Sequence, residues 1–177
     1  MLEVRLARKD EAKAVCLFYE SHIDAVQRAE YTPRWKKNSY PSDAYLKEAV
    51  ENQELYIGME DGQIVSAMIL NHKCNESYEK AKWPVERATE EILVVHTLAV
   101  HLDFCRRGIA GKMLTKAVEV GKEKKCTAIR LDTLYLNHPA TNLYLKFGFQ
   151  CVDEVPMYYE DTGWMNFKLF EYSLEHS

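Results

Sequence analysis

The stretch from residue 91 to residue 134 constrains the fold of this chain more than any other part of the sequence. EILVVHTLAV (91–100) and TAIRLDTL (127–134) are apolar enough to be strands that are buried on both faces. Between them, GIAGKMLTKAVEVGKEK (108–124) repeats apolar residues at helical spacing along one side. A buried strand, a helix and a second buried strand predict a parallel crossover within an α/β sheet.

The flanking segments extend this crossover at both ends. ELYIGME and QIVSAMIL surround Asp61–Gly62, a pair that is typical of a tight hairpin turn. After the crossover, residues 138–147 read as a short helix that ends at Gly148, and two strand-like runs close the chain. Residues 71–90 are polar and predict a long loop. The sequence therefore predicts a mixed α/β sheet with the parallel crossover in its middle.

Composition narrows the class of protein. The chain has 177 residues, so residues 1–177 are expected to form a single domain. A net charge of −4 disfavours a nucleic-acid partner, and the apolar runs are too short to span a membrane. The five cysteines are scattered and form no CxxC pair, which favours reduced thiols in the cytoplasm over disulfides or a metal cluster.

The segment CRRGIAG (105–111) combines positive charge, glycines and a helix start. Glycine lets the backbone approach a ligand closely, and the first turn of a helix exposes unpaired N–H groups with partial positive charge. Arg106, Arg107 and Lys112 add charge nearby. This combination predicts a cradle for an anion such as a diphosphate. Neither GxxxxGK[ST] nor GxGxxG is present, so the two common nucleotide fingerprints are excluded.

The segment resembles the [R/Q]xxGx[G/A] signature of the GNAT acetyltransferases, with Gly108 as its first glycine. Cys105 stands where the family has Arg or Gln. A second segment, NHPATNLYLKFGF (137–149), is similar to the family's NxxAxxLYxxxGF pattern, and the opening VRLARKDEAKAV also resembles the family. The resemblance spans nearly the whole chain. It implies a single mixed, mostly antiparallel sheet with a central β-α-β-α crossover and helices on both faces.

The resemblance also implies the reaction and the coenzyme. Members of the family transfer the acetyl group of acetyl-CoA to an amine, without a metal. In this chain the pantetheine arm would pair with backbone in the gap between the two buried strands, and the diphosphate would bind N–H groups at the helix start. The residues that the resemblance assigns to the coenzyme are Leu98, Ala99, Val100, Arg106, Arg107, Gly108, Ile109, Ala110, Gly111, Lys112, Asn137 and Tyr144.

Two residues are candidates for proton transfer. Tyr144 matches the tyrosine that protonates the CoA sulfur in many members of the family, although packing alone would also explain a tyrosine there. His96 is an imidazole within an apolar strand, and its ordinary pKa of about 6.5 suits a base at neutral pH. A buried, structural histidine is the alternative, and Glu90 or Glu91 are other candidate bases. Neighbouring arginines are expected to lower the pKa of Cys105, but no histidine beside it supports a covalent route.

The acceptor site is expected in the segments that least resemble the family, which are residues 29–42, residues 71–90 and YYEDTGW (158–164). These segments are rich in aromatic rings and contain acidic residues, which attract a cationic amine. The acceptor is a small molecule or a peptide amine. A non-catalytic acyl-CoA sensor, another acyl group and a homodimer stay open. The aromatic and acidic candidates are Trp35, Tyr40, Trp83, Tyr158, Tyr159, Trp164, Glu160 and Asp161.

Overall fold

The computed structural model describes residues 1–27 and 34–175 of the chain. It contains seven strands, four α-helices and four short 3-10 helices in these residues. The strands are β1 (Glu3–Leu6), β2 (Leu55–Glu60), β3 (Gln63–Asn71), β4 (Ile92–Val100), β5 (Ala128–Leu134), β6 (Gln150–Tyr159) and β7 (Gly163–Ser173). The α-helices are α1 (Ala12–Val26), α2 (Asp43–Glu51), α3 (Ile109–Glu123) and α4 (His138–Phe147), and the 3-10 helices are η1 (Lys9–Glu11), η2 (Glu76–Lys80), η3 (Thr89–Glu91) and η4 (Leu102–Phe104).

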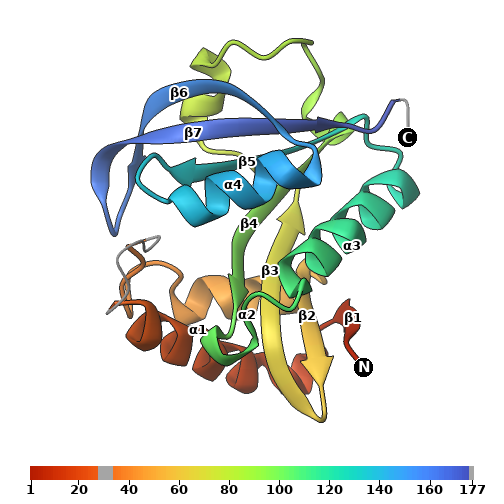
Figure 1. Ribbon diagram of the computed structural model, residues 1–177, viewed down its shortest axis with the longest axis vertical. Helices are drawn as coiled ribbons and strands as arrows, with labels where there is room; N and C mark the ends of the chain where they lie inside the picture. Colours follow the sequence, from red (N-terminus) through yellow and green to blue (C-terminus); the bar gives the residue numbers. More distant parts are fainter. Residues whose placement is uncertain (28–33, 176–177) are drawn as a thin grey trace.

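The strands form one sheet in the order β1-β2-β3-β4-β5-β7-β6 (Figure 1). Every neighbouring pair is antiparallel except β4 and β5, which are parallel and are connected by α3. The predicted crossover is therefore confirmed, as is a mixed and mostly antiparallel sheet. Parallel strands need a long connection, and α3 supplies it while covering the sheet.

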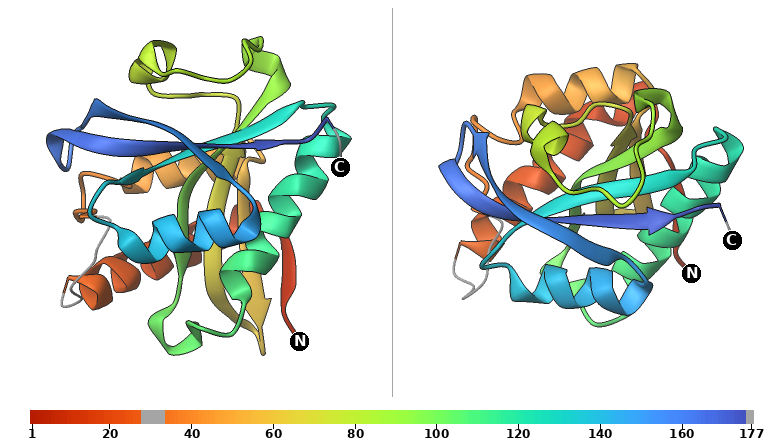
Figure 2. Two further views of the ribbon diagram at one scale, coloured as in Figure 1. Left: turned by 45° about the horizontal axis from the view of Figure 1, so that its top comes forward. Right: turned by 90° about the horizontal axis from the view of Figure 1, so that it is seen from above.

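Helices cover both faces of this sheet, as expected. Figure 2 shows α1 and α2 on one side and α3 and α4 on the other. The first side buries α1 and α2 residues against β2 and β3, with Tyr19, Leu46 and Ile57 almost fully buried. On the other side, α3 packs Met113, Leu114 and other apolar residues against the sheet and α4. Apolar burial on each face holds the crossover rigidly in place.

Strands β4 and β5 pair over a short distance and then diverge. Their register covers three residue pairs and ends at Val94 opposite Arg130. Beyond this point β4 continues to Val100 beside β3, while β5 continues to Leu134 beside β7. The edges of β4 and β5 that face each other are therefore left without strand partners, and a gap opens in the middle of the sheet.

Local signals in the sequence predicted several boundaries. Asp61 and Gly62 have positive φ angles of 50° and 77°, as the tight hairpin turn requires. Helix α4 has the predicted bounds, and Gly148 follows it with a φ of 121°. The long loop at 71–90 is only partly irregular, because β3 continues to Asn71 and the segment contains η2 and part of η3. Residues 29–33 of the expected acceptor region lie outside the described residues.

None of the helices within residues 1–27 and 34–175 has the length and apolar character that crossing a bilayer requires.

Candidate functional site

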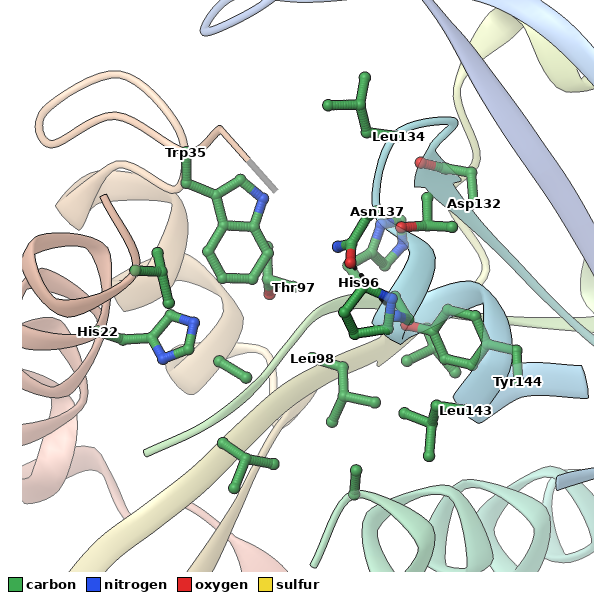
Figure 3. Close-up of a pocket in the computed structure, with 18 of the residues that line it drawn as sticks. His22, Trp35, His96, Thr97, Leu98, Asp132, Leu134, Asn137, Leu143 and Tyr144 are labelled. Carbon is green, nitrogen blue, oxygen red and sulfur yellow. Dashed lines mark hydrogen bonds between the residues drawn. The ribbon is translucent and has the colours of Figure 1, made fainter. Parts of the chain in front are cut away.

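A cavity of about 290 Å³ lies at the gap between β4 and β5. Figure 3 shows His22 and Trp35 on one side of it, and Asn137, Leu143 and Tyr144 on the other. The walls therefore come from α1 and the segment before α2 on one side, and from β5 and α4 on the other. Backbone from residue 95 to residue 100 of β4 forms a further wall.

Strand β4 carries a bulge where it lines the cavity. Ile69 pairs with His96 and Ala67 with Ala99, so Thr97 and Leu98 together face the single residue between them on β3. Thr97 has a φ of 52°, and its carbonyl oxygen accepts a hydrogen bond of 2.7 Å from the hydroxyl of Tyr19. A bulge leaves the extra residue outside the ladder. The bulge therefore takes backbone at Thr97 and Leu98 out of the regular pairing with β3, and the Thr97 carbonyl is held by Tyr19 instead.

His96 lies half-buried just before the bulge and lines the cavity. Its Nε2 is 2.7 Å from Oδ1 of Asn71. Burial lowers the pKa of His96 to about 4, although a backbone contact with Lys73 acts in the opposite direction. The imidazole is consequently neutral at pH 7, which is the form that can accept a proton, but it is a weak base.

The alternative bases are placed elsewhere. Glu90 and Glu91 lie in η3 at the start of β4, and neither is among the described residues that line the cavity. Oε2 of Glu91 accepts a hydrogen bond of 2.8 Å from the backbone N–H of Ala88. This carboxylate is therefore engaged in the local turn and not directed at the gap.

Tyr144 lies in α4 on the opposite side of the sheet from His96 and is 7% exposed. Its ring packs against Phe149 and Phe170, with centroids 5.8 and 5.4 Å away. The residue lines the cavity, and no described group forms a hydrogen bond with its hydroxyl. Burial, with a smaller effect of Asp132, raises the pKa of Tyr144, so the hydroxyl stays protonated at neutral pH. Packing and proton donation are compatible here.

The start of α3, where the sequence predicts an anion cradle, presents unpaired backbone donors. Gly108 precedes the helix with a φ of 75°, and the first backbone hydrogen bond into α3 runs from the N–H of Lys112 to the carbonyl of Gly108. The N–H groups of Ile109, Ala110 and Gly111 therefore have no backbone acceptor in the described structure. A Cβ added at Gly108 or Gly111 would meet open space. Exposed donors beside open space fit a phosphate group.

The side chains around the predicted cradle differ in their exposure and in their partners. Arg107 forms a 2.6 Å ion pair with Glu60 at the end of β2, and its guanidinium lies 5.0 Å from the ring centre of Phe104. Arg106 and Lys112 are exposed. Ala110 lines the cavity, whereas the Ile109 side chain is 3% exposed and packs in the core. Ile109 can therefore offer its backbone alone.

Cys105 also lines the cavity, but its thiol differs from the sequence-based expectation. Partial burial raises the pKa of Cys105 and outweighs the opposite effect of Arg106. The thiol is protonated at neutral pH, so the expected lowering of its pKa is wrong. This result removes the main argument for a cysteine nucleophile.

The remaining coenzyme candidates line the gap as well. Leu98, Ala99 and Val100 contribute the β4 wall beyond the point where β5 diverges. Asn137 caps α4, because its Oδ1 accepts a 3.2 Å hydrogen bond from the backbone N–H of Ala140. Figure 3 shows the Asn137 side chain at the cavity between Trp35 and Tyr144.

The aromatic and acidic candidates for the acceptor site divide into two groups. Trp35, Tyr40, Tyr159 and Asp161 line the cavity. Trp83 is not among the described lining residues; it packs over Arg130, whose guanidinium lies 3.9 Å from the centre of the indole ring. The remaining candidates are exposed and are not among the described lining residues: Tyr158, Glu160 and Trp164. The rings of Tyr158 and Trp164 contact each other.

Two lining residues were missed by the reasoning from sequence. Asp132 lies on β5 and accepts hydrogen bonds from the hydroxyls of Tyr78 and Tyr159. His22 lies on α1; its Nδ1 is buried without a hydrogen-bond partner, and burial lowers its pKa to about 4. The signal that could have identified Asp132 was an acidic residue within the buried strand-like run TAIRLDTL.

The part of the chain that the structure describes contains no group of three or more His, Cys, Asp or Glu side chains arranged to hold a metal ion.

Comparison with known proteins gives consistent results. The family model described as "Acetyltransferase (GNAT) family" matches residues 21–149. A curated Bacillus subtilis protein, "Putative ribosomal protein bS18-alanine N-acetyltransferase", is 25% identical over 144 residues, which cover 80% of this chain and 82% of that protein.

Solved structures share the fold. A GNAT-family acetyltransferase from Streptococcus agalactiae superposes with a TM-score of 0.81 at 22% identity, covering 97% of this chain and 95% of that one. Arabidopsis thaliana NAA60, solved in complex with acetyl-CoA, superposes with a TM-score of 0.68 at 16% identity and covers 98% of this chain and 99% of its own.

Proposed function

This chain belongs to the acetyltransferase (GNAT) family, and from that premise we propose that it moves an acetyl group from acetyl-CoA to a primary amine by direct attack within a ternary complex. The observation that carries the proposal is the divergence of β4 and β5 beyond Val94 and Arg130. It creates one cavity that reaches the start of α3 on one side and the α1–α2 side of the sheet on the other. Two substrates can therefore meet from opposite faces.

The chain's own groups suit the coenzyme. The free N–H groups at Ile109, Ala110 and Gly111 would bind the diphosphate, and Arg106 and Lys112 add positive charge. The edge of β4 from Leu98 to Val100 that faces β5 has no strand partner. The pantetheine arm would form backbone hydrogen bonds with this edge, as an added strand does. Acetyl-CoA, when bound, supplies the acetyl group as a thioester.

Proton transfer is assigned to two residues on opposite sides of the gap. The protonated hydroxyl of Tyr144 is the donor for the leaving sulfur, which becomes basic only as its bond to the acetyl carbon breaks, and the tyrosinate regains its proton from solvent. Neutral His96, held by Asn71, accepts the proton that the amine loses, directly or through water. Because the pKa of His96 is low, the imidazolium holds this proton only briefly and then releases it to solvent.

The acceptor is proposed as a primary amine. The Bacillus relative's name specifies an alanine on a ribosomal protein, so a peptide that begins with alanine is one acceptor to test. Small aliphatic amines are the other class, because the cavity of about 290 Å³ is near the lower limit of small-molecule sites.

The test is a steady-state assay of free thiol released from acetyl-CoA in the presence of each amine, with mass spectrometry of the product. We expect thiol release that depends on one class of amine, together with an acetylated product. Tight binding of CoA without turnover on any amine would instead indicate a non-catalytic sensor. Faster turnover with propionyl-CoA or a longer acyl-CoA would assign a different acyl group.

A further inference from the structure

Two acidic residues line the side of the cavity where we propose that the acceptor binds. Asp132 from β5 and Asp161 from the β6–β7 turn both line it. Side chains alternate along a strand, so His96 lies on the same side of the sheet as Val94. Tyr78 and Tyr159, which hydrogen-bond to Asp132, belong to the apolar cluster that contains Val94. Asp132 thus lies on the His96 side of the sheet, from which an amine would approach.

Asp132 is held in a fixed position with one oxygen free. The hydroxyls of Tyr78 and Tyr159 donate to its Oδ2 over 2.6 and 2.9 Å. No described group donates a hydrogen bond to Oδ1. Burial raises the pKa of Asp132, and the two hydroxyl donors act against that rise by stabilising the carboxylate. Figure 3 shows Asp132 on the β5 side of the cavity, across from Trp35.

Asp161 provides an independent observation. The residue is 5% exposed, yet its Oδ1 has no hydrogen-bond partner in the described structure. Burial raises its pKa, and two backbone N–H groups and Lys36 act in the opposite direction. Leaving a buried carboxylate oxygen without a hydrogen-bond partner is energetically costly. Such an orphaned group in a cavity wall indicates that a ligand supplies the missing donor.

No described side chain neutralises this pair. Within residues 1–27 and 34–175 neither Asp132 nor Asp161 forms an ion pair, and Lys36 acts on Asp161 only at longer range. Trp35, Tyr40 and Tyr159 supply aromatic walls beside the carboxylates, and the Tyr40 and Tyr159 rings lie 5.5 Å apart. Buried carboxylates without cations are costly, whereas a bound cation compensates them and gains from aromatic faces.

We propose that the acceptor is an aliphatic diamine, with its reacting nitrogen beside Asp132 and its second ammonium group on Asp161. This inference rests on the proposed acetyl transfer. One ammonium group compensates the charge of one carboxylate, so the second carboxylate requires a second cation.

The experiment compares α,ω-diamines of three to eight carbons with amino alcohols of the same lengths, in which a hydroxyl replaces the distal amine. Binding to the full chain is measured by calorimetry in the presence of CoA, and turnover by thiol release. We expect at least one diamine to bind 10-fold or more tightly than its hydroxyl partner. Equal affinities at every length, or no binding by any diamine, would overturn the proposal.

Single variants test which carboxylate binds the distal ammonium group. Asp161→Asn should weaken binding of the best diamine about 10-fold and leave the amino alcohol unchanged, and Asp132→Asn should weaken both. Glu160→Gln is the matched control, because it removes the same charge from the same turn at an exposed position. A loss in Glu160→Gln as large as that in Asp161→Asn would show a general charge effect and contradict a specific site. Thermal unfolding of each variant establishes that it folds.

The two proposals can fail separately. If amino alcohols or an alanine peptide are acetylated as efficiently as every diamine, the acetyltransferase assignment stands and the diamine assignment is wrong. If diamines bind selectively but release no thiol from acetyl-CoA, the acidic site stands as a diamine site and the proposed reaction is wrong.

Discussion

Nε2 of His96 lies 2.7 Å from Oδ1 of Asn71, and the surroundings of Asn71 determine which atom carries the proton. The backbone N–H of Lys73 donates to the same Oδ1 over 3.0 Å, and Nδ2 of Asn71 donates to Glu54 over 3.2 Å. These two partners fix the orientation of the amide, so Nε2 of His96 must donate. Nδ1 is then the nitrogen that can accept a proton.

Replacing Asn71 by Asp should raise the pKa of His96. A carboxylate 2.7 Å from the ring would stabilise the imidazolium, which the neutral amide does only weakly. We expect the His96 pKa to move upward from about 4 by one unit or more, as measured by NMR titration of its ring signals. An unchanged titration would show that Asn71 does not contact the ring in solution. Asn75→Asp, in the adjoining loop, is the control for added charge.

The stability of the fold should fall as pH decreases from about 6.5 to about 4. Burial lowers the pKa of His22 and His96 from 6.5 to about 4 in the folded chain, so the unfolded chain binds protons first. Stability therefore rises with pH across this window, by up to about 3 kcal/mol for each histidine. Urea unfolding at several pH values measures this slope. A variant with both histidines changed to Asn should lose most of it; an equal slope would assign the effect to other groups.

Tyr144→Phe should lower kcat by about 10²-fold or more while the KM for acetyl-CoA changes little, because a general acid contributes in the transition state only. The ring packing against Phe149 and Phe170 is retained, so stability should be nearly unchanged. Tyr172→Phe is a matched control, since Tyr172 packs on Phe149 without lining the described cavity. A full rate in Tyr144→Phe would remove the hydroxyl from the reaction.

Ala110→Asp should separate folding from coenzyme binding. An acidic residue in the first turn of α3 interacts favourably with the helix dipole, so unfolding stability should stay constant or rise by about 0.5 kcal/mol. The same carboxylate would repel a diphosphate at the cradle, and we expect CoA affinity to fall about 100-fold by calorimetry. Thr115→Asp, exposed farther along the helix, should bind CoA normally. Normal CoA binding by Ala110→Asp would place the diphosphate elsewhere.

The local pattern of the chain determined much of the fold. Asp61–Gly62 predicted the hairpin because both residues adopt positive φ without a large penalty. Asn137 and Gly148 mark the ends of α4, and the two buried strands around α3 predicted the parallel crossover. These features depend on neighbours in the sequence, which is why they can be read from it. The resemblance to the family then pointed to the segments around Gly108 and Tyr144.

The tertiary structure alone decided the chemistry on the side of the cavity where we propose that the acceptor binds. Asp132 meets Tyr78 and Tyr159, and His96 meets Asn71, only because the sheet order brings distant segments together. Burial then moved each pKa in a direction that sequence neighbours do not reveal. At Cys105 it outweighed an adjacent arginine and reversed the expected shift. Secondary structure follows from local preferences, whereas charge, protonation and burial depend on what the completed fold places around each group.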